Sequence, residues 1–140
     1  MNRTKHSILT LAVFVTGALA SAIAMATEVP VTLSGASEVP PVQTAAGGRG
    51  KIVVGDDGAV SGGITTTGIA GTIAHIHMGA TGKNGPPIVS LFVGPGAAMA
   101  GCAMANTGQL AEMIADPANF YVSVATTDFP DGALRGQLSG

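Results

Sequence analysis

The two histidines of the segment His75-Ile76-His77 are the residues whose types and spacing could most directly do chemistry in this chain. They lie two positions apart in an apolar run, so both imidazole rings would leave the same face of a β-strand. Neutral imidazole is a common ligand of copper and zinc. The pair therefore predicts either half of a metal site or two histidines hydrogen-bonded to nearby turn backbone, and both interpretations stay open.

A second stretch with metal-ligating residue types runs from Met99 through Cys102 to Met104. Thioether and thiolate sulfur suit Cu(I), so these side chains are candidate partners of His75 and His77 in a copper site. The competing interpretation is an apolar loop packed inside the domain, because free cysteine packs as a small hydrophobic residue. Cys102 is the only cysteine, so no disulfide can form within the chain.

No set of residues typical of an acid–base or nucleophilic enzyme stands out. A Ser-His-Asp arrangement needs a base that a third group orients, whereas both histidines belong to one strand face. The paired carboxylates of Asp56-Asp57-Gly58 are explained by a hairpin turn. Lys83 and Asn84, in the glycine-rich stretch after the histidines, are interpreted as solvated turn residues. The sequence therefore favours a protein that is not an enzyme.

Glu38 and Arg135 are the next pair of interest. Glu38 lies in an early loop with Pro40 and Pro41, and Arg135 lies in the last predicted strand. First and last strands of small β-domains are often neighbours, so we expect a structural ion pair in which the guanidinium fork binds the carboxylate. The alternative is that Glu38 faces a ligand.

Residues 1–26 have the pattern of a secretory signal peptide. A positively charged start is followed by an uncharged apolar stretch, and Ala24-Met25-Ala26 matches the small-x-small cleavage pattern. Cleavage after Ala26 would leave residues 27–140 as one domain without a transmembrane segment, in the periplasm or outside the cell. An uncleaved membrane anchor is the alternative.

The charge of the chain limits its partners. Without residues 1–26, four basic side chains face eight acidic ones, and the formal charge becomes −4 in place of −2. A protein that binds phosphate backbones needs a basic patch, so nucleic acid is excluded as a partner. The expected partner is a protein or a small ligand.

Alternation of apolar and polar residues predicts about seven short strands. The predicted strands cover residues 29–33, 49–54, 59–67, 72–78, 88–93, 120–126 and 133–138. The single predicted helix covers 108–116, with Leu110, Met113 and Ile114 on one side and Asn106 as its cap. These elements predict an all-β fold, an antiparallel immunoglobulin-like sandwich or barrel with one short helix before the penultimate strand.

Three segments together resemble the CHRD domain family, named for the repeated domain of chordin. They are residues 33–42 with Glu38-Val39-Pro40-Pro41, residues 74–86 from Ala74-His75 to Gly85-Pro86, and residues 120–138 with Asp131-Gly132-Ala133-Leu134-Arg135-Gly136. The resemblance covers essentially all of residues 27–140. It implies a small, β-rich extracellular module.

The chain departs from the family pattern in the late strand. The family's usual Tyr-Val-Asn-Val-His-Thr has Ser123 here in place of the asparagine and Ala125 in place of the histidine. If the family's histidines act together, this chain has lost one of them. The resemblance therefore lends less support to a metal site than the histidine pair alone would suggest.

The residues and the resemblance together predict an exported, non-catalytic binding or structural module whose ligand is unidentified. The alternative is a periplasmic copper- or zinc-binding protein that uses the two histidines, with the Met99–Met104 stretch supplying further ligands. The remaining motif positions are assigned structural roles, and these are Glu38, Pro40, Pro41, Gly85, Pro86, Arg135 and Gly136.

Overall fold

A computed structural model describes residues 17–18, 25–96 and 98–139. Within these residues, one antiparallel sheet holds eight strands in the order β5-β4-β7-β8-β1-β2-β3-β6. The strands are β1 (Ala26–Ser34), β2 (Gly47–Gly55), β3 (Ala59–Thr67), β4 (Gly71–Met78), β5 (Pro87–Gly96), β6 (Ala98–Met104), β7 (Phe120–Ala125) and β8 (Leu134–Gln137). The helical elements are η1 (Gly35–Ser37), α1 (Thr107–Ala115) and η2 (Pro117–Asn119).

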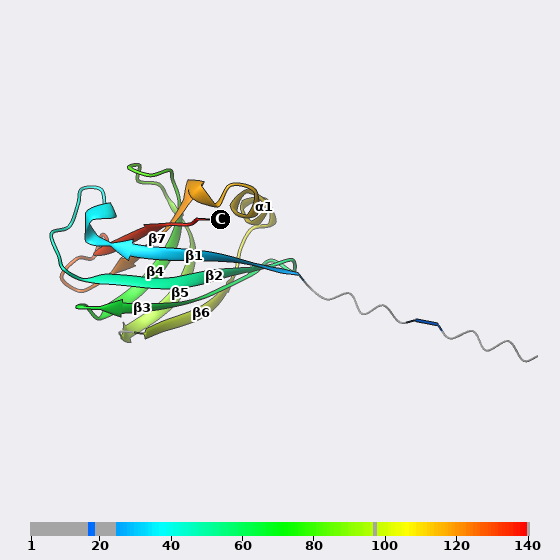
Figure 1. Ribbon diagram of the computed structural model, residues 1–140, viewed down its shortest axis with the longest axis horizontal. Coiled ribbons are helices and arrows are strands. Elements are labelled where there is room, and N and C mark those ends of the chain that lie inside the picture. The colour runs from blue at the N-terminus through cyan, green and yellow to red at the C-terminus, as the bar shows by residue number, and fades with distance from the viewer. Residues whose placement is uncertain (1–16, 19–24, 97, 140) are drawn as a thin grey trace, which may run out of the picture.

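The sheet curls into a nearly closed barrel (Figure 1). Its two edge strands, β5 and β6, are consecutive in sequence and contact each other where the barrel closes. The prediction of an antiparallel all-β fold is confirmed, and the barrel is the arrangement that forms. The prediction that the first and last strands are neighbours is also confirmed, because β1 pairs with β8 at Ser34 and Arg135.

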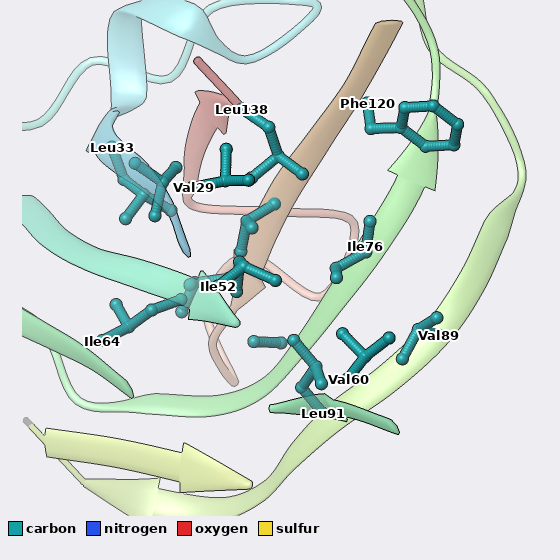
Figure 2. Packing of buried hydrophobic residues seen from close by; sticks show 14 of the residues in the cluster. Val29, Leu33, Ile52, Val60, Ile64, Ile76, Val89, Leu91, Phe120 and Leu138 are labelled. Atoms are coloured by element: carbon teal, nitrogen blue, oxygen red, sulfur yellow. The ribbon is translucent and has the colours of Figure 1, made fainter. Parts of the chain in front are cut away.

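Side chains alternate between the barrel interior and its outer face, as the period of two in a β-strand requires. On β1, for example, Val29, Val31 and Leu33 are each 2% exposed, whereas the residues between them are exposed. Figure 2 shows Val29, Leu33, Ile52, Ile76 and Leu138 converging on one interior. Full burial of such a side chain stabilises the fold by about 1.5–3 kcal/mol.

Strand β6 corrects the prediction of a loop around Met99, Cys102 and Met104. It pairs with β3 in a register that places Gly101 opposite Gly62. Alanine and glycine are depleted in strands, so a segment this rich in both gives no strand signal in the sequence. The pairing places the backbone of Cys102 opposite that of Ser61, but the side chains of β6 lie outside the described residues.

The predicted helix is confirmed as α1, which comes directly before η2 and β7. Asn106 caps it as predicted, because its side-chain oxygen accepts a hydrogen bond from the backbone N–H of Gly108 at 2.9 Å. Of the three residues predicted to share one side, Leu110 and Met113 are buried and Ile114 is 41% exposed. Ile114 follows Met113 and is turned about 100° further around the helix, away from the core.

Helix α1 and the η1 segment lie towards different ends of the barrel. In Figure 1, η1 and the loop that follows it, in cyan, lie at one end of the sheet, and α1 lies towards the other. None of the helices that the structure describes is long and apolar enough to cross a membrane.

Candidate functional site

Strand β4 sends both histidines to the outer face of the barrel. Ala74 and Ile76 are fully buried in the core, and His75 and His77, which alternate with them, are half-buried on the opposite face. The two ring centroids lie 5.9 Å apart, and the ring planes are nearly perpendicular, at 84°. The prediction that both imidazoles share one face of a strand is confirmed.

His77 is held in one orientation by two neighbours. Its Nδ1 lies 2.8 Å from the carbonyl oxygen of Gly85, and because a carbonyl can only accept, Nδ1 carries a proton and donates it. Its ring stacks on Tyr121 with centroids 4.8 Å apart. Burial, and to a smaller extent the neighbouring imidazole of His77, lowers the pKa of His75. The lowered pKa favours the neutral form of the His75 ring.

The histidines belong to a grid of side chains on the outer face of β4, β7 and β8. Strand pairing places His77 beside Tyr121 and Tyr121 beside Gln137, which makes one row. The same pairing places Ser123 between His75 and Arg135 in a second row. Sequence reasoning gave Tyr121 no role and named Ser123 only as a departure from the family pattern, although the alternation along β7 puts both on the face opposite its core residues.

Arg135 fastens the loop of residues 79–86 onto this grid. It is only 1% exposed, and its guanidinium carbon lies 3.5 Å from the centre of the Tyr121 ring. Its Nη2 donates to the carbonyl oxygens of Ala80 and Lys83 at 3.0 and 2.9 Å. Gln137 adds a bond from its amide nitrogen to the Gly79 carbonyl at 2.6 Å. These bonds explain why side chains on the outer face of a barrel are buried.

Asn84 is not the freely solvated turn residue that the sequence suggested. Its side-chain nitrogen donates to the carbonyl of Val39 at 2.7 Å, and its side-chain oxygen accepts from Arg135 Nη1 at 3.2 Å. Asn84 therefore joins the 79–86 loop to the segment that carries Glu38. The partners of an amide in a turn depend on tertiary structure, so no sequence signal could have identified them.

The predicted ion pair between Glu38 and Arg135 does not form. Glu38 is 8% exposed, and its Oε1 accepts a hydrogen bond from the Ser123 hydroxyl at 3.2 Å. Within the described residues, the one pair of opposite charges within 4.0 Å is Lys51 and Glu28, at the surface. The guanidinium acts on Glu38 only from a longer distance, because loop oxygens already occupy its donors.

Burial raises the pKa of Glu38 above its ordinary value of 4.5, against smaller opposing effects of the Ser123 hydrogen bond and the Arg135 charge. At pH values between 4.5 and the raised pKa, the folded protein holds a proton that the unfolded chain has lost. The free energy of unfolding should therefore fall as the pH rises from about 4.5 through the raised pKa.

We expect Glu38→Gln to keep the acceptor for Ser123 and to remove this pH dependence. The free energy of unfolding, measured with urea, should change less between about pH 4.5 and pH 7 than it does in the wild type. At pH 7 it should equal the wild-type value or exceed it by up to about 1 kcal/mol. Glu112→Gln, at an exposed position of α1, is the control and should leave the pH dependence unchanged. A variant that is less stable at pH 7 would instead indicate a direct ion pair.

Two adjoining clefts share the segment around Glu38 as a common wall. The Arg135 cleft, of about 470 Å³, lies between residues 36–41 and Thr81-Gly82 and is also lined by Arg135 and Gln137. The Phe129 cleft, of about 280 Å³, lies between residues 38–42 and residues 128–132. Glu38 and Val39 line both.

The remaining motif positions are places where backbone segments meet. The Val39–Pro40 peptide bond is cis, and Pro41 lines the Arg135 cleft. The carbonyl of Pro86 accepts from the Met78 N–H at 3.2 Å. A Cβ at Gly136 would lie 2.4 Å from the Thr32 carbonyl oxygen, so β8 approaches β1 there too closely for a side chain.

The candidate metal ligands lie on two separate strands, β4 and β6. Among the described residues, no three His, Cys, Asp or Glu side chains are close enough to hold one ion together. The side chains of Met99, Cys102 and Met104 lie outside those residues. Strand β6 contacts β5, which pairs with the histidine strand β4, so β5 separates the backbones of the two candidate ligand segments at the barrel closure.

Comparison with known proteins gives one match. A family model described as the CHRD domain matches residues 29–138, from within β1 to the residue after the last strand. No curated protein and no solved structure matches the chain.

Proposed function

The chain belongs to the CHRD domain family, and from this premise we propose that it is an exported, non-catalytic binding module. The pattern of residues 1–26, with its apolar stretch and Ala24-Met25-Ala26, supports export. The family match covers all of the barrel except the first three residues of β1, so the barrel itself is the module.

The observation that carries the proposal is the pair of clefts on either side of Glu38. Ligand sites in proteins are concave, largely preformed, and lined by apolar groups with a few placed polar ones. The shared wall is held on both sides, by Asn84 through the Val39 carbonyl and by Ser123 through the Glu38 carboxylate. The clefts are therefore formed before a ligand arrives, which reduces the ordering that binding requires.

Three polar groups of the grid, on His77, Tyr121 and Arg135, favour binding over catalysis because they are engaged in holding the loop. His77 Nδ1 and the Tyr121 hydroxyl both contact backbone atoms of Gly85. Arg135 is committed to oxygens of the loop and to Gln137. A general base must reach the proton that it removes, whereas these groups serve to fix one surface.

A thermal-shift screen tests the proposal. Glycans, capped peptides, organic acids and amines are added to the protein, and at least one class should raise its melting temperature. The rise should shrink in Thr81→Trp, which fills the Arg135 cleft, or in Phe129→Ala, which removes one wall of the Phe129 cleft. Ligands that raise the melting temperature of both variants as much as that of the wild type would contradict the proposal. So would ligands that are chemically converted during incubation.

A second candidate function, the binding of copper or zinc by His75 and His77, is favoured by the contact of His77 with Gly85. Metal-ligating histidines commonly donate their other ring N–H to a carbonyl, which fixes the tautomer and the ring orientation. Two imidazoles on one ion, each with a metal–nitrogen distance of about 2.0–2.1 Å, have centroids no more than roughly 6 Å apart. The observed 5.9 Å is within that limit.

If this second function holds, titration of Cu(II) and Zn(II) followed by calorimetry should show binding tighter than about micromolar, and the double variant His75→Ala, His77→Ala should weaken it at least about 100-fold. Cu(I) titration of Cys102→Ser tests whether the β6 residues contribute. Gln137→Ala, which alters the grid without removing a ring, is the control. Binding that survives loss of both histidines would eliminate this function.

A further inference from the structure

We propose that the Phe129 cleft binds a basic side chain, lysine or arginine, presented by a partner protein. This inference rests on the binding function proposed above and names the chemistry of one group of its ligand. It follows from a buried carboxyl group that lines the cleft, from apolar walls, and from a local excess of negative charge.

The buried carboxyl group is that of Glu38. One oxygen accepts from Ser123, and the other makes no hydrogen bond or direct ion pair with any residue that the structure describes. The side chain is 8% exposed, and it lines the cleft. No fully buried side-chain oxygen of the described residues lacks a partner, so this second oxygen keeps some contact with solvent, and a carboxylate that is otherwise withdrawn from water is stabilised by a nearby cation. A cation in the cleft would supply that stabilisation.

The ionisable side chains that line the cleft are all acidic. Asp128 and Asp131 are exposed and line it together with Glu38. Two of the four basic residues that the structure describes are already engaged, since Lys51 pairs with Glu28 and Arg135 holds the loop. Carboxylates around low-dielectric walls concentrate cations. The net negative charge of the chain acts in the same direction.

The apolar walls of the Phe129 cleft favour a basic side chain over a bare metal ion. Val39, Pro40, Val42 and Pro130 line the cleft, and Phe129, also in its wall, is 40% exposed. Lysine and arginine carry aliphatic stems that pack on such walls, and their charged heads are attracted to aromatic faces. Among the described residues, no three carboxylates are close enough to hold a metal ion.

The size of the cleft points to one side chain. Its volume of about 280 Å³ is at the lower limit of the roughly 300–1,000 Å³ typical of pockets for drug-sized ligands. The adjoining Arg135 cleft, of about 470 Å³, continues past Glu38 and leaves room for the flanking chain of a peptide. A partner that presents a basic residue from an extended segment therefore fits both clefts.

Nuclear magnetic resonance of the ¹⁵N-labelled protein tests this inference. The probes are tripeptides with acetylated and amidated ends, Gly-Arg-Gly, Gly-Lys-Gly and Gly-Gln-Gly. The arginine and lysine peptides should shift the backbone amides of Val39, Phe129 and Gly132 in a saturable manner, and the glutamine peptide should not. Glu38→Gln should weaken binding at least about fivefold and Asp131→Asn about twofold, whereas Glu112→Gln on α1 should leave it unchanged.

Each alternative result overturns the inference. Equal shifts with the glutamine peptide would show that charge is not recognised, and unchanged affinity in a folded Glu38→Gln variant would show that this carboxylate is not the partner. If no peptide shifts these amides while another ligand class raises the melting temperature through the Arg135 cleft, the basic-group inference fails and the binding function stands. If neither the peptides nor any ligand class of the thermal-shift screen binds, the basic-group inference and the binding function both fail.

Discussion

Replacing Arg135 with alanine should destabilise the protein by about 3 kcal/mol, close to the limit of what a single substitution commonly does. The side chain is almost completely buried and donates to the oxygens of Ala80, Lys83, Asn84 and Gln137. Its removal leaves these acceptors without their donors. A hydrogen bond to a charged group contributes about 1.5–3 kcal/mol, and water entering the space offsets part of the sum.

Two further variants show whether geometry or charge is responsible. Arg135→Lys keeps the charge but loses the planar fork and the stacking on Tyr121, so we expect about half the destabilisation. Arg49→Ala removes an exposed arginine of β2 and should change stability by less than about 0.5 kcal/mol. The measurement is urea unfolding, with hydrogen exchange of residues 79–85 as a local readout. Equal stability of Arg135→Ala and Arg49→Ala would contradict the role assigned to Arg135.

The features that the sequence predicted well are those governed by neighbours in the chain. The alternation around His75 and His77 placed both rings on one face. Asp56-Asp57-Gly58 predicted the β2–β3 hairpin, in which the Gly58 N–H bonds to the Gly55 carbonyl at 3.1 Å and Gly58 has a φ of +86°. Asn106 predicted the start of α1. In each case a local preference and the fold agree.

The features that the sequence did not predict depend on contacts between distant segments. Arg135 finds its acceptors in backbone carbonyls more than 50 positions away, and any residue type offers a carbonyl. The ion pair with Glu38 was inferred from opposite charge and neighbouring strands, and both conditions are met. It fails because the fold supplies Arg135 with nearer acceptors, which only the conformation of the 79–86 loop reveals.

The grid of side chains shows how register turns an ordinary pattern into a site. His77, Tyr121 and Gln137 each face outward from a strand in which inward and outward residues alternate. Only the pairing of β4 with β7 and of β7 with β8 brings them into one row. A slip of one residue in either pairing would exchange the two faces of a strand. The core residues Ala74, Ile76 and Val122 on the other face therefore hold the grid in place.

The second large effect concerns Gly85, which should not tolerate alanine. A Cβ at this position would lie 1.6 Å from the Met78 carbonyl oxygen, which is backbone and has little freedom to move. The loop must shift, and the contacts of Gly85 with His77 Nδ1 and the Tyr121 hydroxyl are then lost. We expect a destabilisation of about 2–4 kcal/mol, from steric overlap and from the polar groups left unpaired.

Gly82→Ala is the matched control within the same loop. Gly82 has a φ of +76°, but a Cβ there would meet no atom within 4 Å, so only the left-handed backbone conformation opposes the substitution, at about 1 kcal/mol. The imidazole resonances of His77 should move in Gly85→Ala and stay in place in Gly82→Ala, because only the first substitution displaces the carbonyl that fixes the ring. If the two variants lose equal stability and leave His77 unchanged, the loop is not what orients the histidine. The surface on which both proposed functions depend would then be far less rigid than the hydrogen bonds of Arg135, Gln137 and His77 require.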